Sequence, residues 1–519
     1  MGMQTAETAE AFLACAGDFQ LGELVTEQSH PMTAQLSALA CNDLPAAVQC
    51  LQAVDQAALA TLASKLAPVD ELVAAIRTVW AVGGRVFLAG CGATGRLSLS
   101  LEVFCREGLV PEALAERVIA FMAGGDAALI RSIEGFEDFP AYGVRQLHEL
   151  GFGANDLLIA STEGGETPWV IGVTEEAARL SEHRPWFVYC NPDSALIALV
   201  ERSRRVLHQP GICKWELAVG PMAIAGSTRM QASTVLEYGI GLALETAANG
   251  AGDVGPAIAA RLEAFQSQVD ALDWQQIVPF VEREAALYQA DRHVLYATAS
   301  CGVGVLTDTT ERAPTFSLPI FESYAAGRTS DPLSLCYLMQ AGAVEAGAAW
   351  QALLKRAPRC LTWPDDLPAT RLSTLMRYDI SAAAKDNRAR ACGQEPVVFS
   401  IREHADALIW ELDELRATLV PAGFPLLERQ LLLKLFLNAH STLVMGRLGR
   451  YQGNLMTYVK PSNNKLIDRA IRYLQELHTR ATGTTPAYAH VCRTLFEQRA
   501  TLRPDEPIVL KTLAALEHR

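Results

Sequence analysis

The sequence has no concentration of basic residues. No run of five or more Lys and Arg occurs, and the formal net charge is −14. Proteins that bind nucleic acid or anionic membranes gather positive charge on one surface. The sequence therefore argues against both partners. A small phosphate ligand stays compatible with it, because such a site needs only local amides and one or two cations.

Paired cysteines and hydrolase motifs are also lacking. The 12 Cys show neither a Cys-x-x-Cys pair nor a Cys/His spacing typical of metal sites, and several, such as Cys190 and Cys360, lie in apolar runs. We expect reduced cysteines in a cytoplasmic protein that needs no metal. Neither a signal peptide nor an apolar stretch that could span a bilayer is evident. No Gly-x-Ser-x-Gly nucleophile motif occurs.

Strand patterns alternate with helical patterns along most of the 519 residues. This alternation is typical of parallel, doubly wound sheets. We expect strands at 85–89, 118–122, 156–160, 186–190, 205–208, 293–298, 360–363 and 396–400, and a long helix from about 227 to 248. The sequence thus predicts an α/β protein with two tandem doubly wound, flavodoxin-like domains. Their expected bounds are 61–255 and 256–470, with an N-terminal helical segment (1–60) and a C-terminal helical cap (471–519).

The first strand leads into a glycine-rich loop, Gly90-Cys91-Gly92-Ala93-Thr94-Gly95-Arg96. Glycines allow tight turns and close approach of the backbone to a ligand, here at Gly92. We expect the next helix to begin near Gly95, so that its free amides and dipole favour an anion. Thr94 supplies a hydroxyl and Arg96 a cation. The spacing alone also fits a dinucleotide site or a plain structural turn.

Two more helix starts carry hydroxyl groups. One lies in Thr162-Glu163-Gly164-Gly165-Glu166-Thr167-Pro168, where Thr167 fits a helix N-cap and Pro168 the first helical residue. The other is Gly226-Ser227-Thr228-Arg229-Met230. The carboxyl ends of parallel strands share one edge of a sheet. We therefore expect these segments to converge on one anion-binding pocket.

Two pairs of acidic residues are candidates for proton transfer. Glu134 and Glu137 lie in the segment 133–138, and Asp308 and Glu311 are three residues apart on one expected helix. From residue types alone, both pairs are more typical of solvated surface charge than of a catalytic site.

Six motifs together resemble a known family. Their order is similar to that in the sugar isomerase (SIS) domains of the N-acetylmuramic acid 6-phosphate etherase branch, which includes the glucokinase regulatory protein. The resemblance covers about residues 60 to 480. The motifs are Gly90–Arg96, Ala123-Gly124-Gly125, Glu134-Gly135-Phe136-Glu137-Asp138, Cys190-Asn191-Pro192, Gly226–Met230 and Asn464-Lys465-Leu466-Ile467-Asp468-Arg469-Ala470.

The resemblance implies different roles for the two expected domains, 61–255 (the first half) and 256–470 (the second half). The two-domain length looks like the regulatory protein, with two SIS domains and a helical cap, whereas the etherase looks like one such domain working as a dimer. The stretch from Thr307 to Phe316 resembles the etherase segment that holds a catalytic glutamate, and the first half has Phe104 at that place. We expect one competent pocket, built by the first half and completed by the second.

The resemblance also implies roles for individual residues. Glu137 would act as the base and Glu311 as the acid, and Glu134 would contact the sugar. The remaining ligand contacts would come from Gly92, Thr94, Arg96, Thr167, Ser227, Thr228 and Lys465.

The second loop departs from the family pattern. Glu163-Gly164-Gly165-Glu166-Thr167 stands where a Ser-Gly-x-Thr pattern is usual, Ala93-Thr94 stands where the family shows Thr-Ser, and Gln231 replaces a Lys. A phosphate-binding hydroxyl is thus missing. The glutamates would repel a dianion by about 1 kcal/mol or more at 4 Å.

Three functions stay open from the sequence. The first is a cytoplasmic SIS protein that binds an amino-sugar 6-phosphate and eliminates an ether substituent from it. The second is a non-enzymatic regulator that responds to a sugar phosphate and acts on a protein partner such as a sugar kinase. The third is an aldose–ketose isomerase. None requires a metal or organic cofactor, and a homodimer stays open.

Overall fold

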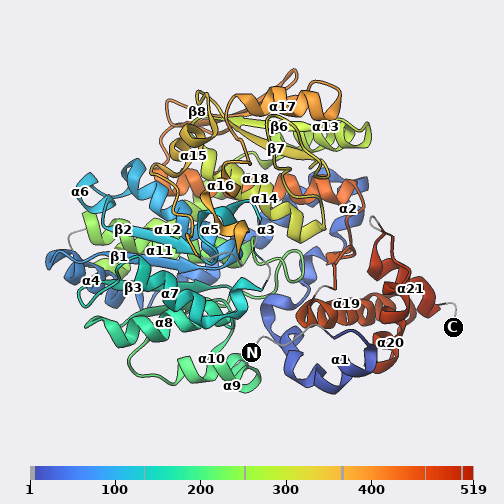
Figure 1. Cartoon of the computed structure of the whole chain (residues 1–519), viewed down its shortest axis with the longest axis horizontal. Helices are drawn as coiled ribbons and strands as arrows, with labels where there is room; N and C mark the ends of the chain where they lie inside the picture. The colour runs from blue at the N-terminus through green and yellow to red at the C-terminus, as the bar shows by residue number, and fades with distance from the viewer. Residues whose placement is uncertain are drawn as a thin grey trace.

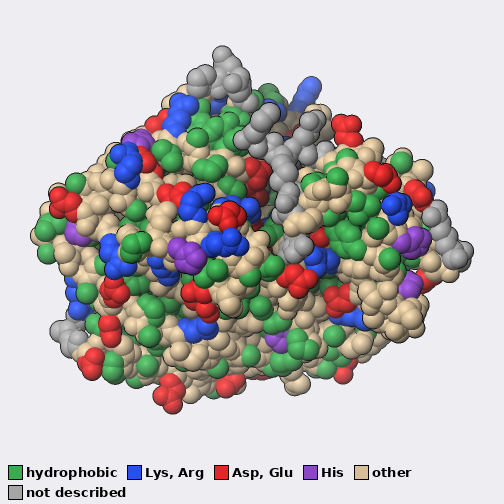
Figure 2. Space-filling model, turned by 90° about the horizontal axis from the view of Figure 1, so that it is seen from below, with side chains coloured by type: hydrophobic (Ala, Val, Ile, Leu, Met, Phe, Trp, Pro, Cys, Tyr) green, Lys and Arg blue, Asp and Glu red, His purple; other side chains and the backbone are tan. Residues whose placement is uncertain are grey.

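Two β-sheets and a group of C-terminal helices make up the structure (Figure 1). It is a computed structural model that describes residues 6–131, 133, 135–249, 253–363, 367–461, 463–503 and 506–517. Within these residues, no helix is long and apolar enough to cross a membrane. On the face shown in Figure 2, acidic and basic side chains are interspersed over the coloured residues. The domain bounds expected from the sequence remain predictions.

The first sheet has five parallel strands in the order β2-β1-β3-β4-β5. This order confirms the expected doubly wound α/β fold. The strands are β1 (Val86–Gly90), β2 (Val118–Met122), β3 (Leu157–Thr162), β4 (Trp186–Tyr189) and β5 (Cys213–Glu216). The strand expected at 205–208 is wrong, because these residues end helix α10 (Glu201–Leu207) and turn Val206 inward at helical spacing from Ser203.

Side chains alternate between the two faces of this sheet, as the period of two in a strand requires. Val86 and Leu88 belong to one apolar cluster, whereas Phe87 and Ala89 belong to another. Helices α4 (Val69–Ala81), α5 (Gly92–Phe104) and α11 (Gln231–Asn249) cover the first face, and α7 (Pro140–Glu149) and α8 (Pro168–Leu180) cover the second. The first cluster continues into the second half of the chain, so the α5 face joins the two halves.

The second sheet combines parallel and antiparallel strands in the order β10-β9-β8-β6-β7. Strand β6 (Val294–Thr298) pairs in parallel with β7 (Cys336–Gln340) and β8 (Val397–His404). An antiparallel edge of β9 (Ala407–Leu412) and β10 (Leu415–Val420) follows β8. The second half is therefore an α/β unit whose doubly wound part is extended by a β-meander.

Helices between residues 9 and 63 pack on elements from far along the chain. Helix α1 (Ala9–Cys15) lies against α20 (Tyr488–Arg499), while α2 (Leu36–Asn42) and α3 (Leu44–Ala63) lie against α18 (Leu426–Arg447). The remaining helices are α6 (Glu112–Ala115), α9 (Asp193–Leu199), α12 (Val254–Ala271), α13 (Val278–Gln289), α14 (Gly302–Phe316), α15 (Ala346–Leu354), α16 (Leu372–Leu375), α17 (Ala383–Cys392), α19 (Asn464–Thr482) and α21 (Ile508–Glu517). A two-stranded ribbon is formed by β11 (Tyr451–Gln452) and β12 (Leu455–Met456).

The segment 356–363 crosses from the second half to the first and forms no strand, so the strand expected at 360–363 is wrong. Its apolar side chains, Leu361 and Trp363, pack into the cluster on the far face of the first sheet instead of joining a ladder. Trp363 stacks on Phe136, with ring centroids 5.5 Å apart. This segment, the crossing segment, thus fastens the second half to the rim of the first sheet.

Buried ion pairs hold the start of the crossing segment. Arg356 lies 3.0 Å from Glu102 and 2.6 Å from Asp126, and Arg359 lies 2.8 Å from Glu102. The side chain of Glu102 is only 1% exposed. A buried carboxylate and its arginines depend on each other, because the loss of one partner leaves a desolvated charge.

We expect Glu102→Gln to lower the free energy of unfolding by about 3 kcal/mol, since both arginines lose part of their compensation. Glu116→Gln is the matched control: Glu116 pairs with Arg106 at 2.5 Å but is 72% exposed, so its loss should cost less than about 1 kcal/mol. Urea unfolding followed by circular dichroism measures both. Equal effects of the two substitutions would contradict the assignment.

Candidate functional site

The loops that follow β1 and β3 lie side by side at the carboxyl edge of the first sheet. These two strands are neighbours, and the chain leaves β1 towards β2 on one side and β3 towards β4 on the other. Such a reversal of strand order opens a crevice in which doubly wound proteins bind ligands. The hydroxyl-bearing segments expected from the sequence flank this crevice.

The glycines of the first loop are required by its geometry. A Cβ on Gly90 would lie 2.4 Å from the backbone of Thr94, and Gly92 has φ +54°. Helix α5 begins at Gly92, earlier than the sequence suggests. Thr94 therefore lies in the first helical turn. Its hydroxyl accepts a hydrogen bond from the backbone amide of Cys91 (3.0 Å) and donates one to the backbone carbonyl of Cys91 (2.9 Å). In this structure Thr94 closes the turn; its contact with a ligand stays a prediction.

Arg96 and Glu311 meet across the two halves. Arg96 Nη1 lies 2.5 Å from Glu311 Oε1, and the two side chains are 1% and 10% exposed. The guanidinium also donates to the hydroxyl of Thr310 and to the carbonyl of Leu129. The sequence treats Arg96 as a cation facing a ligand. In the structure it holds Glu311, the proposed acid, beside the first loop, and its contact with a ligand stays a prediction.

The second loop carries a compensated carboxylate. Glu166 pairs with Lys465 of α19 at 2.9 Å and with Arg202 of α10. Burial would raise the pKa of Glu166, but the charges of Lys465 and Arg202 outweigh it and lower the pKa to about 2. The group of three keeps one net positive charge. The repulsion that the sequence suggests from Glu166 is thus cancelled locally.

Thr167 is the N-cap of α8, and Pro168 is its first residue, as the sequence predicts. Its hydroxyl does not cap the helix. It lies 3.0 Å from the hydroxyl of Thr162, at the end of β3. Thr167 is half-buried and stands at the same edge as the first loop.

Glu163 is a buried carboxyl group at the centre of the edge. It is 7% exposed, and its Oε1 accepts a hydrogen bond from Ser233 of α11 at 2.9 Å. Burial raises the pKa of Glu163 to about 7; the charge of Glu311 raises it further, while the Ser233 hydrogen bond and Lys434 oppose the rise. Burial and the charges of Glu137, Glu163 and Glu166 together raise the pKa of the Cys91 thiol. The three carboxyl groups therefore surround the first loop.

The third hydroxyl cluster is a turn rather than the start of a helix, because α11 begins only at Gln231. The hydroxyl of Ser227 lies 3.4 Å from that of Thr315 on α14, and the carbonyl of Thr228 accepts from the amide and hydroxyl of Ser233. Both residues reach the site, Ser227 buried and Thr228 half-buried.

Glu137 lies in a short 3-10 turn, Phe136–Asp138, in which Phe136 is buried and Glu137 and Asp138 are exposed. Desolvation by the surrounding protein raises the pKa of Glu137, Glu166 and Asp138 add to this rise, and Lys465 and Arg469 oppose it. A carboxyl group with a raised pKa suits the exchange of a proton near neutral pH. Glu134, the other carboxylate expected here, lies outside the described residues.

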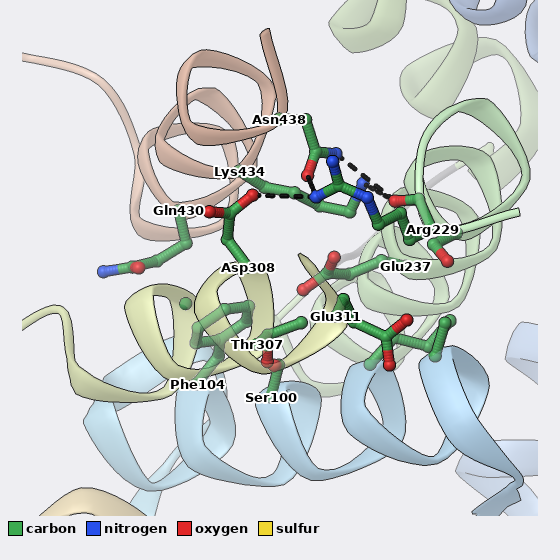
Figure 3. A pocket seen from close by; sticks show the side chains of 14 residues that line it. Ser100, Phe104, Arg229, Glu237, Thr307, Asp308, Glu311, Gln430, Lys434 and Asn438 are labelled. Atoms are coloured by element: carbon green, nitrogen blue, oxygen red, sulfur yellow. Dashed lines mark hydrogen bonds and ion pairs between the residues drawn. The ribbon is translucent and has the colours of Figure 1, made fainter. Parts of the chain in front are cut away.

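A small internal cavity of about 30 Å³ adjoins the edge between α5, α11, α14 and α18 (Figure 3). It has room for about one water molecule. Glu237 and Lys434 line it with Asp308 and Glu311. Burial raises the pKa of Glu237 to about 7 and lowers that of Lys434 to about 8, although their opposite charges limit both shifts. Lys434 donates to the carbonyls of Arg229 and Met230 and so fixes the turn before α11.

The corresponding edge of the second sheet is filled by side chains. A Cβ on Gly302 would lie 2.5 Å from Gln340 Oε1, and the gap beside it measures about 10 Å³. The hydroxyl of Ser300 accepts from the amide of Glu403. Among the described residues, Gln340 and Ser300 thus occupy the edge of the second sheet that corresponds to the first loop. One competent pocket per chain remains a prediction.

The sequence reading missed three groups at the site: Ser233, Glu237 and Lys434. Ser233 and Glu237 sit four residues apart on one buried helix, and Lys434 lies in an otherwise apolar stretch of α18. A charged residue within an apolar helix is the signal that could have revealed Lys434.

A doubly wound sheet with glycine- and hydroxyl-bearing loops at its switch point defines a small-molecule-binding α/β protein. Residues 68–177 match the family described as glucokinase regulatory protein N-terminal SIS domain. The N-acetylmuramic acid 6-phosphate etherase of Synechocystis sp. is 31% identical over 221 residues, 43% of this chain and 67% of that protein. The etherase of Rhodopirellula baltica is 33% identical over 215 residues, 41% of this chain and 66% of that protein.

Among solved structures, a tagatose-6-phosphate ketose/aldose isomerase from Escherichia coli aligns with 76% of this chain and 92% of its own, at a TM-score of 0.42 and 11% identity. The chain spans about two thirds of the length of the etherases that it matches. It belongs to the SIS domain family, in the branch of the N-acetylmuramic acid 6-phosphate etherases.

We expect Arg96→Met to lower the free energy of unfolding by about 3 kcal/mol, because Glu311 is left charged and buried. The double substitution Arg96→Met/Glu311→Met should cost less than the sum of the single ones, by about 0.5–3 kcal/mol. Arg179→Met, which removes a 64% exposed partner of Glu176, is the control and should leave the free energy of unfolding nearly unchanged. Additive single effects in urea unfolding would show that the pair does not couple the two halves.

Proposed function

We propose that this protein binds the 6-phosphate of an amino sugar at the carboxyl edge of the first sheet and eliminates an ether substituent from it. The observation that carries the proposal is the convergence of distant segments on that edge. The loops after β1 and β3 come from the first half, whereas Lys465 reaches Glu166 from α19 and Glu311 reaches Arg96 from α14. The related etherases supply the chemistry.

The electrostatics of the edge support an anionic ligand. Helices α5 and α8 both begin there, and helix N-termini offer free amides and a partial positive charge. The net positive charge of Lys465, Arg202 and Glu166 lies beside them. A phosphate in the crevice would be held by amides and by Lys465.

Elimination needs a base beside an acidic C–H bond and an acid beside the leaving oxygen. Glu137 removes the proton α to the open-chain aldehyde, the bond from carbon to the ether oxygen breaks, and Glu311 gives that oxygen a proton. Because Glu311 is paired with Arg96, the ligand has to open this pair first, and Glu311 then takes up from solvent the proton that it donates. The two carboxyl groups thus come from the two halves of one chain.

We expect N-acetylglucosamine 6-phosphate to raise the melting temperature of the wild type, as a ligand at about 100 times its dissociation constant stabilises a fold by about 2.7 kcal/mol. Lys465→Met should weaken binding by roughly tenfold, the equivalent of about 1.4 kcal/mol for one charged hydrogen bond. Lys460→Met, on the exposed side of the same segment, is the control. No shift of the wild type with any hexose or amino-sugar 6-phosphate would refute the proposed site.

We expect the wild type to release lactate from N-acetylmuramic acid 6-phosphate, and Glu137→Gln to slow the release by about 10²–10⁴-fold, the usual contribution of a general base. Asp138→Asn, which changes the adjacent carboxylate, should retain most of the activity. Lactate is measured enzymatically, and NMR of the sugar detects isomerisation in the same samples. Equal rates for Glu137→Gln and Asp138→Asn would contradict the role of Glu137.

A second candidate is a regulator that binds the sugar phosphate without converting it. The buried pair of Arg96 and Glu311 favours it, because a ligand that opens this pair changes the contact between the two halves. A protein partner could read that change. Binding without lactate release or isomerisation in the two assays above would select this candidate.

A further inference from the structure

The backbone of Glu163 is fixed, so its carboxyl group cannot leave the crevice easily. Its carbonyl accepts from the amide of Cys190, and the next carbonyl, that of Gly164, accepts from the side chain of Asn191. Ser233 holds the carboxyl group itself at 2.9 Å. Any anion bound between the first loop and the start of α8 must share the edge with this group.

The charges around Glu163 do not neutralise it. The groups that face it are Ser233 of α11, Lys434 of α18, Glu311 of α14, and the thiols of Cys91 and Cys190. The charge of Lys434 lowers the pKa of Glu163, but its ammonium group donates to Thr234 and to two carbonyls. Glu311 is held by Arg96. Glu166 differs, because two cations bind it directly.

A dianion and a carboxylate that share a desolvated edge repel each other, and one proton removes most of that repulsion. Glu163 can accept this proton without losing the hydrogen bond, since a protonated carboxyl group still has an acceptor oxygen for Ser233. The cavity that Ser233 and Glu237 line, one turn apart on α11, has room for a water molecule beside them.

We propose that the binding of a phosphate dianion at this edge is coupled to the uptake of one proton by Glu163. The protonation state of Glu163 then determines at which pH values the site binds a phosphate dianion. This inference rests on the proposed sugar-phosphate site. The proton comes from solvent and returns to it on release, so the balance needs no other reactant.

The sign of the pH dependence follows from the raised pKa of Glu163, about 7 in the free protein. A bound dianion raises the pKa further, so the complex keeps the proton where the free protein has lost it. Affinity should therefore fall as pH rises above about 7, by up to tenfold per pH unit. Lys434, whose pKa is lowered to about 8, also titrates in this range, and so a variant of Glu163 itself is needed to separate the two groups.

Isothermal titration calorimetry with N-acetylglucosamine 6-phosphate at pH 7.0, 7.75 and 8.5 tests the coupling. Titrations in two buffers of different ionisation enthalpy count the protons taken up. We expect the wild type to bind about one proton at pH 8.5 and about half a proton at pH 7, with an affinity that falls by roughly tenfold across this range. Glu163→Gln, which mimics the protonated form, should bind at least as tightly as the wild type and take up about one proton fewer at pH 8.5; any uptake that remains belongs to Lys434.

Two further variants complete the design. Glu163→Ser should behave like Glu163→Gln, which guards against a fault in the folding of one of them. Glu166→Gln removes the other carboxylate of the same loop and should change the affinity but keep the proton uptake of the wild type.

The outcomes separate this inference from the proposed function. Binding by the wild type without proton uptake, or equal pH dependence in Glu163→Gln, overturns the inference and leaves the site intact. Binding by Glu163→Gln alone also overturns the inference, since Glu163 of the wild type then fails to take up the proton that the coupling requires. Binding by neither protein overturns both.

Discussion

Two buried arginines link the halves of this chain, and the geometry of the site depends on them. Arg96 on α5 reaches Glu311, and Arg229 before α11 reaches Asp308 at 2.9 Å. A charge taken out of water is costly unless a partner meets it at short range. Neither arginine can be moved without exposing its partner to the same cost. The apolar contact between the halves would permit several positions, whereas these ion pairs fix one position of the halves relative to each other.

The same ion pairs place charged groups of the second half beside the loops of the first sheet. The first half supplies loops and helix starts, and the second half supplies Glu311, Lys434 and Lys465. At the equivalent edge of the second sheet, Gln340 fills the space beside Gly302. The second half thus brings charged groups next to the loops of the first sheet, where the proposed ligand would touch residues of both.

Two glutamates of the same loop show how environment sets the role of a side chain. Glu166 meets two cations and stays ionised, whereas Glu163 meets a hydroxyl and more distant charges, and its pKa rises to about 7. From the sequence they read as two equal negative charges that repel a phosphate. In the fold, one is part of a positive group and the other is a group that can take up a proton.

The sequence alone determined the fold class, six of the twelve strands in the described residues, and the helix start at Thr167 and Pro168. Those features depend on local patterns: apolar periodicity, glycine at tight turns, and capping residues.

Only the tertiary structure decided what each polar group faces. Thr94 closes its own turn, Arg96 holds Glu311, and Lys434 lies beside a cavity. The strands expected at 205–208 and 360–363 were wrong because burial against other elements, rather than local pattern, fixed those segments. Partners, desolvation and pKa depend on residues hundreds of positions apart, and no local pattern contains them.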